Sequence, residues 1–167
     1  MTRWVALLRG VNVGSARRVS MPDLRARLAE RGADDVATYV QSGNVVLSSA
    51  GEADSVGRLV RDAVADLGVG CDVVVRSGAE MADVVGRNPW PDRVGEPTKL
   101  NVGFLDGPTA GEARRVADEE EVRFDGRELW LWYGAGQGRS KLVLDVGQRV
   151  LTVRNWRTVL ALAEMSA

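Results

Sequence analysis

The sequence predicts an α+β fold made of two halves that repeat the same order of strands and helices. Apolar residues alternate at every second position in some segments and recur at helical spacing in others, which indicates both element types. Each half also contains a two-residue turn signal between strand-like runs, Ser42-Gly43 in the first and Asp125-Gly126 in the second. Between the halves, Asn88-Pro89-Trp90-Pro91 contains two prolines, which forbid a continuous helix there.

The first half is predicted to follow the order β-α-β-β-α-β. Its first helix has a clear start, because Ser20 can cap it and Asp23 follows three residues later. Met21, Leu24 and Leu28 give that helix an apolar stripe to bury. The predicted strands of this half span residues 3–9, 36–41, 44–49 and 72–76, and the predicted helices span 21–31 and 53–67.

The second half is predicted to repeat this order. A short helix at 78–87 leads into the proline-containing join, and the elements predicted for the second half are a strand at 99–105, a helix at 109–119, strands at 121–124 and 127–133, and helices at 139–147 and 155–165. The repeat indicates an internal structural duplication. We therefore expect an N-terminal subdomain at 1–77, a helical linker at 78–98 and a C-terminal α+β subdomain at 99–167.

The turn at Ser42-Gly43 predicts the faces of the first hairpin, because opposite residues of an antiparallel pair point to the same side. Val40 is expected opposite Val45, and Thr38 opposite Leu47. The other face then carries a mixed aromatic and polar set, Tyr39, Gln41, Asn44 and Val46.

The turn at Asp125-Gly126 assigns the faces of the second hairpin in the same way. Val122 is expected opposite Leu129, and Phe124 opposite Arg127. Leu131 and Tyr133 extend the apolar face, and the other face carries Arg123, Glu128, Trp130 and Trp132. We expect the second faces of the two halves to pack together, and the alternative is an open platform on which nucleic-acid bases stack.

Composition places the chain among ordinary globular proteins. Its 167 residues are 45% hydrophobic and 27% charged, which is enough to form a core without a disulfide or a metal. A formal net charge of −1 gives no overall attraction to nucleic acid or to an anionic membrane, so neither is an expected partner. The apolar runs are too short for a membrane span or a secretory signal, and we expect a cytoplasmic protein.

The absence of histidine removes most common catalytic arrangements. No Ser-His-Asp or Cys-His pair can form, and zinc sites built on histidine are excluded. Cys71, the single cysteine, lies in an apolar segment and is assigned to the core. Carboxylate or lysine chemistry, a carboxylate-held Mg²⁺ and binding without chemistry stay open. The sequence therefore does not decide whether the chain is an enzyme, and it predicts no catalytic residue, metal ligand or cofactor.

A polar segment follows the first predicted strand, and strand ends of this kind commonly hold ligands. The segment Arg9-Gly10-Val11-Asn12-Val13-Gly14 has the spacing of neither a dinucleotide-binding fingerprint nor a P-loop. Its glycines permit close backbone approach, and Arg9 offers a planar fork for carboxylate or phosphate. Asn12 either contacts a ligand or holds the turn in a left-handed conformation.

Further donors lie in a glycine-rich segment of the second half. All but two of the 22 basic residues are arginines, and the exceptions are Lys99 and Lys141. A lysine can bind phosphate as a compact charge. Residues 134–141 could form an anion-binding loop to which Ser140 and Lys141 add donors, or a flexible connector. Lys99 shares one side of its predicted strand with Asn101.

Two more polar residues, Arg154 and Asn155, fall at the first turn of the last predicted helix. Anions are favoured at that position because of the helix dipole. A capping role explains Asn155 equally well.

Four segments carry motifs of one protein family: LLRGVNVG at 7–14, TYVQSGNV at 38–45, SKL at 140–142 and TVRNWRT at 152–158. Together, in this order, they resemble the family called domain of unknown function 1697. The resemblance implies an α+β fold of two ferredoxin-like subdomains. It transfers no catalytic residue, because the biochemical role of the family is uncharacterised. The motif positions fall at Arg9, Gly10, Asn12, Gly14, Tyr39, Gln41, Ser42, Gly43, Asn44, Ser140, Lys141, Thr152, Arg154, Asn155 and Thr158.

We expect a cleft between the two halves that binds a small anionic molecule, such as a phosphate compound or a nucleotide. Nearly all the residues expected to line it donate hydrogen bonds and none is acidic, which suits anion capture. They are Arg9, Asn12, Gln41, Asn44, Lys99, Ser140, Lys141, Arg154 and Asn155. One alternative is a single-stranded nucleic-acid binder that uses Tyr39, Trp130 and Trp132. The other is a protein interaction module without a small ligand. The sequence predicts neither the identity of the ligand nor the oligomeric state.

Overall fold

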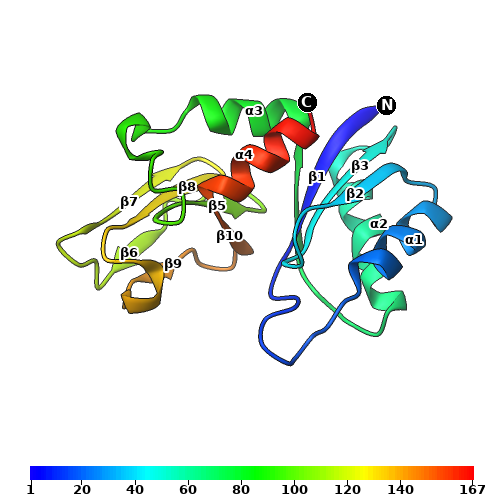
Figure 1. Cartoon of the computed structure of the whole chain (residues 1–167), viewed down its shortest axis with the longest axis horizontal. Coiled ribbons are helices and arrows are strands. Elements are labelled where there is room, and N and C mark those ends of the chain that lie inside the picture. Colours follow the sequence, from blue (N-terminus) through cyan, green and yellow to red (C-terminus); the bar gives the residue numbers. More distant parts are fainter. The chain divides into compact units, whose positions relative to one another are not determined.

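Two four-stranded antiparallel sheets organise the chain, one in each of two structural units (Figure 1). The structure is a computed structural model that describes residues 1–167. The N-terminal unit consists of residues 1–83 and 161–167, and the C-terminal unit of residues 84–160. The fold is α+β, with four α-helices and antiparallel sheets, as the sequence predicts. No helix is both long enough and apolar enough to cross a bilayer.

The N-terminal unit has the predicted order β-α-β-β-α-β. Its elements are β1 (Thr2–Leu8), α1 (Met21–Glu30), β2 (Asp34–Thr38), β3 (Asn44–Ser49), α2 (Ala53–Asp66) and β4 (Val73–Ser77), and α3 (Gly78–Gly86) follows directly. The sheet has the strand order β2-β3-β1-β4 and every pair is antiparallel. Such an element order is that of ferredoxin-like folds.

One face of this sheet is covered by α1 and α2 (Figure 1). α1 begins as predicted, because Ser20 Oγ accepts a hydrogen bond from Asp23 N at 3.3 Å. Leu24 and Leu28 of α1 and Val60 of α2 are 0% exposed and pack in one core with inward residues of β1 and β3. The amphipathic stripes of the two helices therefore stabilise this layer.

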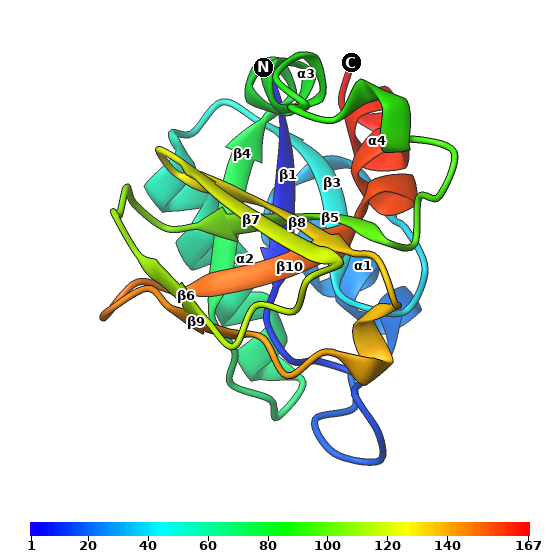
Figure 2. The same cartoon turned by 90° about the vertical axis from the view of Figure 1, so that its left-hand side faces the viewer.

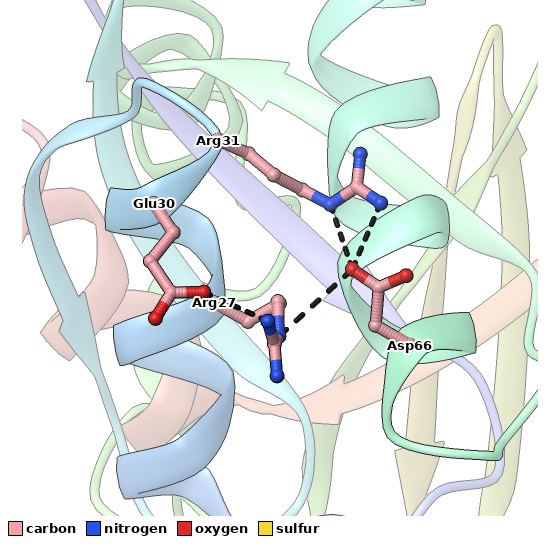
Figure 3. Close-up of polar contacts among 4 residues, drawn as sticks. All are labelled: Arg27, Glu30, Arg31 and Asp66. Carbon is pink, nitrogen blue, oxygen red and sulfur yellow. Dashed lines mark hydrogen bonds and ion pairs between the residues drawn. The ribbon is translucent and has the colours of Figure 1, made fainter.

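An ion network also joins α1 to α2 (Figure 3). Arg31 Nη2 lies 2.8 Å from Asp66 Oδ2, and Arg27 lies 2.8 Å from Glu30 Oε2 and 3.9 Å from Asp66 Oδ2. All four side chains are at least one third exposed, so the network adds little stability. It does pair the charges of Arg27 and Arg31 with those of Glu30 and Asp66.

The last residues of the chain attach to the N-terminal unit. Arg3 Nη2 donates a hydrogen bond to the carbonyl oxygen of Met165 at 3.0 Å. Gly78 lies so close to Ser166 that a Cβ added to the glycine would be 2.0 Å from the Ser166 carbonyl oxygen. Only a glycine fits at this crossing, and no sequence pattern indicates that the two segments meet.

The C-terminal unit contains a second sheet with the strand order β10-β5-β8-β7 (Figure 2). Its elements are the short helix η1 (Pro91–Arg93), β5 (Leu100–Leu105), β6 (Glu112–Arg114), β7 (Glu120–Asp125), β8 (Glu128–Tyr133), the short helix η2 (Gln137–Arg139), β9 (Val143–Asp145), β10 (Leu151–Asn155) and the first half of α4 (Trp156–Met165), whose residues from 161 onward belong to the N-terminal unit. α4 confirms the last predicted helix, and β10 was not predicted.

The predicted helices at 109–119 and 139–147 are wrong. In their place β6 and β9 pair as a separate two-stranded ribbon. Leu142, Leu144 and Val146 of the second segment are half-buried against a core that includes Leu129 and Leu131 of β8. These three residues occur at every second position, so the segment presents an apolar face only when it is extended.

The predicted hairpin registers are also wrong, each by two residues. Thr38 pairs with Val45 in the first hairpin, and Val122 pairs with Leu131 in the second. The second turn lies one residue later than predicted, because Asp125 pairs with Glu128. A shift of two residues leaves the paired strand residues on their predicted faces. Val40 and Gln41, which were expected in the strand, lie instead in the loop after β2, which ends at Thr38. The face assignments of Val45, Leu131 and Val122 are therefore confirmed although the pairing partners differ.

Candidate functional site

Two loops of the N-terminal unit meet where β1 ends. Residues 9–19 follow β1 and extend past the end of the sheet (Figures 1 and 2). Residues 39–43 join β2 to β3. The N–H group of Leu8 donates to the carbonyl oxygen of Gly43 at 2.8 Å, which fixes the second loop to the end of β1. We call residues 9–19 and 39–43 the loop pair.

The side chain of Asn12 links the two loops. Its Nδ2 donates to the carbonyl oxygen of Gln41 at 2.7 Å and to that of Val19 at 2.9 Å. Its Oδ1 accepts from the N–H group of Val19 at 2.8 Å. Asn12 has a φ of 55°, so it also holds the turn in the left-handed conformation that the sequence offered as one of its two roles. The amide of Asn12 is therefore engaged in positioning the loop pair.

Asn44 and Gly43 shape the second loop from within. Asn44 is 0% exposed, and its Nδ2 donates to the carbonyl oxygen of Tyr39 and to Ser42 Oγ, both at 3.0 Å. Gly43 has a φ of 84°, and a Cβ there would lie 2.8 Å from Leu8 Cβ. Both residues are required by the shape of the loop, in agreement with a structural role for this motif.

The exposed groups of the loop pair are cationic or neutral. It carries Arg9, Arg17 and Arg18 and contains no Asp or Glu. All three arginines and Gln41 are exposed. Arg9 Nη1 lies 3.6 Å from Asp72 Oδ2, and both side chains are 56% exposed, so this ion pair is loose. Arg17 donates a hydrogen bond to a backbone carbonyl just before β4.

Backbone strain is concentrated in the loop pair. Three of the five non-glycine residues with positive φ lie there: Asn12 at 55°, Arg17 at 53° and Val40 at 50°. Asn tolerates this conformation, whereas a β-branched residue such as valine is unfavourable in it. Val40 is the most strained of the three on these grounds.

Only some of the predicted site residues of the C-terminal unit lie near the same end of its sheet. β5 begins where β8 and β10 end, since Asn101 pairs with Asn155 and the N–H group of Tyr133 donates to the carbonyl oxygen of Lys99 at 2.9 Å. The glycine-rich segment leaves β8 from this end. Lys99 and Asn155 therefore lie close to one another in the register of the sheet.

Most of these side chains have local partners. Lys99 Nζ lies 2.7 Å from Glu96 Oε1. Asn155 Oδ1 accepts from the backbone N–H three residues later at 3.0 Å and so caps α4. Ser140 Oγ accepts from the backbone two residues later at 3.1 Å. Lys141 is exposed. Lys141 is accordingly the most accessible cation among the predicted residues of this unit.

Arg154 lies on the opposite face of β10 from Asn155, because neighbouring residues of a strand point to opposite sides. Its Nη1 donates to Thr152 Oγ1 at 2.7 Å and to the carbonyl oxygen of Val153 at 3.0 Å. Desolvation by burial lowers the pKa of Arg154 to about 10. The sequence grouped Arg154 with Asn155, and the sheet separates them.

Two of the three aromatic residues offered as a stacking platform, Trp130 and Trp132, are engaged within the C-terminal unit. Trp130 is 1% exposed, and its ring centroid lies 6.0 Å from that of Trp156. The guanidinium of Arg93 lies 4.9 Å from the ring centre of Trp132 and 5.0 Å from that of Trp90. Trp130 therefore presents no free ring face to a base.

One buried carboxylate was not singled out by the sequence. Glu120 is 6% exposed and lies opposite Tyr133 across β7 and β8. Its Oε2 accepts from the N–H group of Ala117 at 3.1 Å. Burial, and to a lesser extent the charge of Glu120, raises the pKa of Tyr133. With the β7–β8 register shifted by two residues from the prediction, Glu120 falls opposite Tyr133, so a correct register would have identified this pair. No three Cys, Asp or Glu side chains are grouped so that they could hold a metal ion.

Comparison with known proteins assigns the chain to a family. The family model described as a protein of unknown function, DUF1697, matches residues 1–130, which is more than half of the chain. The chain belongs to the DUF1697 family. Two of the four motifs, at 7–14 and 38–45, fall within the matched residues and build the loop pair. The other two lie beyond residue 130.

A solved structure has a fold similar to that of this DUF1697 protein. It is described as the conserved bacterial protein SP0830 from Streptococcus pneumoniae. The TM-score is 0.72 with 20% sequence identity, and the alignment covers 99% of each chain. At this identity the likeness shows the fold alone. No curated protein matches the sequence.

Proposed function

We propose that this DUF1697 protein binds a small anionic ligand, of the phosphate or nucleotide type, at the loop pair of the N-terminal unit. The observation that carries the proposal is the exposed guanidinium of Arg9 on a loop segment with three arginines and no carboxylate. A guanidinium fork matches the geometry of a phosphate or carboxylate group and forms strong charge-assisted hydrogen bonds.

The hydrogen bonds of Asn12 and Asn44 support the proposal because they hold the donors in place. Asn12 fixes the first loop to the carbonyl of Gln41, and Asn44 fixes the second loop from within. Less conformational freedom is then lost on binding, which raises affinity without any new contact. The exposed side chains of Arg9 and Gln41 sit on this fixed frame.

The partner of Arg9 also fits this function. Asp72 lies 3.6 Å from Arg9 Nη1 in an exposed pair that contributes little to stability. An anionic ligand can therefore displace Asp72 from the guanidinium at small cost. In the absence of ligand, Asp72 keeps the arginine near the end of β1.

Titration calorimetry of the whole chain with inorganic phosphate, acetyl phosphate and nucleoside phosphates tests the proposal. We expect binding in the millimolar range or tighter that weakens as salt rises, because the exposed charges are screened. Arg9→Ala should weaken binding by about tenfold or more, as expected for lost hydrogen bonds to a charged group.

Arg58→Ala is the matched control, because Arg58 is an exposed arginine of the same unit on α2. It should bind like the unchanged chain. Equal losses in the Arg9 and Arg58 variants, or no binding by any of these anions at millimolar concentration, would refute the proposal. We propose the exposed Lys141 and the paired Lys99 as a second set of donors in the C-terminal unit, to be tested separately by Lys141→Ala and Lys99→Ala.

A further inference from the structure

Two exposed valines stand out in the loop pair. The exposed large apolar side chains of the N-terminal unit are Met1, Val13 and Val40, at 75%, 69% and 55%. Met1 is simply the chain start. Single exposed apolar residues need no explanation, but both of the others fall on the loops that carry the proposed anion site.

One hydrogen bond joins the two loops next to these valines. Asn12 Nδ2 donates to the carbonyl oxygen of Gln41 at 2.7 Å. Val13 directly follows Asn12, and Val40 directly precedes Gln41. Each valine is thus the sequence neighbour of one of the two residues that form this hydrogen bond. Both lie on the loop pair, which also carries Arg9.

The backbone at Val40 does not account for a valine. Its φ of 50° is a conformation that suits glycine or asparagine and disfavours a β-branched side chain. At 55% exposure, more than half of the residue's surface is open to solvent. A polar residue such as asparagine would be both less strained and better solvated here, so neither the backbone nor a core contact accounts for the valine.

We propose that the ligand of the loop pair is an amphiphilic phosphate, a phosphate monoester or acyl phosphate with a short apolar group. The inference rests on the proposed function and names the class of its ligand. The phosphate contacts the guanidinium of Arg9, and the apolar group covers Val13 and Val40. Charge complementarity favours this occupant, since the loop pair holds three arginines and no acidic residue.

A series of alkyl phosphates tests the proposal by calorimetry with the whole chain. The probes are inorganic, methyl, propyl and pentyl phosphate, which share a head group and differ in apolar length. Complete burial of a methylene raises affinity about fourfold. On these exposed loops we expect about half of that burial, and hence about a twofold rise for each added methylene up to the propyl ester.

Two substitutions separate the apolar contact from the anion contact. Val40→Asn suits the left-handed backbone, and Val13→Ser keeps a small side chain, so both variants should fold. The double variant should lose the rise along the series, so that its affinities for the four probes lie close together. Val116→Ser, an exposed valine of the C-terminal unit, is the control and should keep the rise.

Each outcome has a distinct meaning. Binding of inorganic phosphate with equal affinity for all esters overturns this inference and leaves the anion site intact. A rise that persists in the double variant overturns the assignment to Val13 and Val40. Binding of an acidic peptide with apolar residues, with none of the phosphates bound, also overturns it and identifies a protein partner. Failure of every probe overturns the proposed function together with the inference.

Discussion

The two units have sheets with the same strand order but different layers over them. The order β4-β1-β3-β2 in the N-terminal unit corresponds, strand by strand in chain order, to β10-β5-β8-β7 in the C-terminal unit. In the first unit the connections after β1 and β3 contain α1 and α2. In the second unit the equivalent connections contain β6 and β9, which pair with each other. A shared strand order therefore does not require a shared layer.

The difference shows what a covering layer needs. α1 and α2 each bring an apolar stripe that is fully buried, exemplified by Leu28 and Val60. The segment 109–119 contains helix-forming residues but only small or single apolar ones, so a helix there would bury almost nothing. Gly111 instead lies so close to the ring of Phe124 that an added Cβ would be 2.5 Å away.

Leucines of the two layers should contribute very differently to stability. Leu28→Ala removes a side chain that is 0% exposed from the helical layer and should lower the free energy of unfolding by about 2–5 kcal/mol. Leu144→Ala removes a half-buried side chain from the β6–β9 ribbon and should cost about 1–2 kcal/mol, since less area returns to water. Urea unfolding measures both losses of stability, and residue-resolved hydrogen exchange is then recorded on the same variants.

Hydrogen exchange also shows where each loss falls. Leu28→Ala should speed exchange mainly in β1 and β3, and Leu144→Ala mainly in β5 and β8. Equal losses of stability would contradict the view that the ribbon is the weaker layer. A loss in the Leu144 variant larger than that in the Leu28 variant would reverse it.

Much of the fold could be predicted because the N-terminal unit obeys local rules. The Ser20 cap, the stripe of Leu24 and Leu28 and the period-2 strands lead to the correct order of elements. The ribbon was missed because residues 139–147 were interpreted as a helix. Leu142 and Leu144 do alternate with exposed neighbours, so the strand signal was present. Pairing partners could not be fixed, since a turn motif leaves the loop length open.

Each of the two hairpin turns contains a glycine with a positive φ, but only one of them is closely surrounded. Gly43→Ala should cost about 2–3 kcal/mol, because the added Cβ would lie 2.6 Å from Val11 Cγ2 and the φ of 84° disfavours any side chain. Gly126→Ala should cost about 1 kcal/mol, because its φ of 64° is strained but nothing lies within 4 Å. Thermal unfolding of both variants measures the difference, and similar costs would show that the close approach at Gly43 relaxes freely.

Asn12 in the N-terminal unit and Asn88 in the C-terminal unit should contribute differently to stability. Asn12→Ala removes three hydrogen bonds that span 7 and 29 residues, and it should cost about 1–2 kcal/mol and speed exchange throughout the loop pair. Asn88→Ala removes only contacts with Trp90, two residues away, and should cost about 0.5 kcal/mol. If Asn12→Ala left the exchange of residues 39–43 unchanged, Asn12 would not couple the two loops.

The sequence motifs locate the residues of the candidate site, but they do not show which of them are free to bind a ligand and which hold the backbone. The motifs predict Arg9 and Gln41 as donors, and both are exposed as a ligand group must be. They predict Asn44 on the same grounds, but Asn44 is buried, because a motif does not show which of its polar groups the backbone will use. The last helix begins one residue later than predicted, so Arg154 and Asn155 both lie in strand β10 and point to opposite faces. Grouping the two residues in one site was wrong because β10 was not predicted.

The smallest expected effects compare one weak acid in each unit. Burial raises the pKa of Cys71 above 9.0 against the opposing charge of Arg17, and burial raises the pKa of Tyr133 together with the charge of Glu120. Arg17→Ala should therefore raise the Cys71 pKa further and slow alkylation by iodoacetamide at pH 9 by a factor of about 2 to 3. Glu120→Gln should lower the Tyr133 pKa, seen in an ultraviolet titration after Tyr39→Phe removes the other tyrosine.

The direction in which stability changes with pH depends on whether the fold favours the neutral or the charged form of each side chain. Because the folded chain favours the neutral thiol, the stability contributed by Cys71 is complete below the unfolded value of 9.0 and is lost as pH rises through the higher folded pKa. The same holds for Tyr133 above 10.0. Faster alkylation of Cys71 in the Arg17 variant would contradict the electrostatic account. It would show instead that the hydrogen bond from Arg17 to the carbonyl of Gly70 shields the thiol from the reagent.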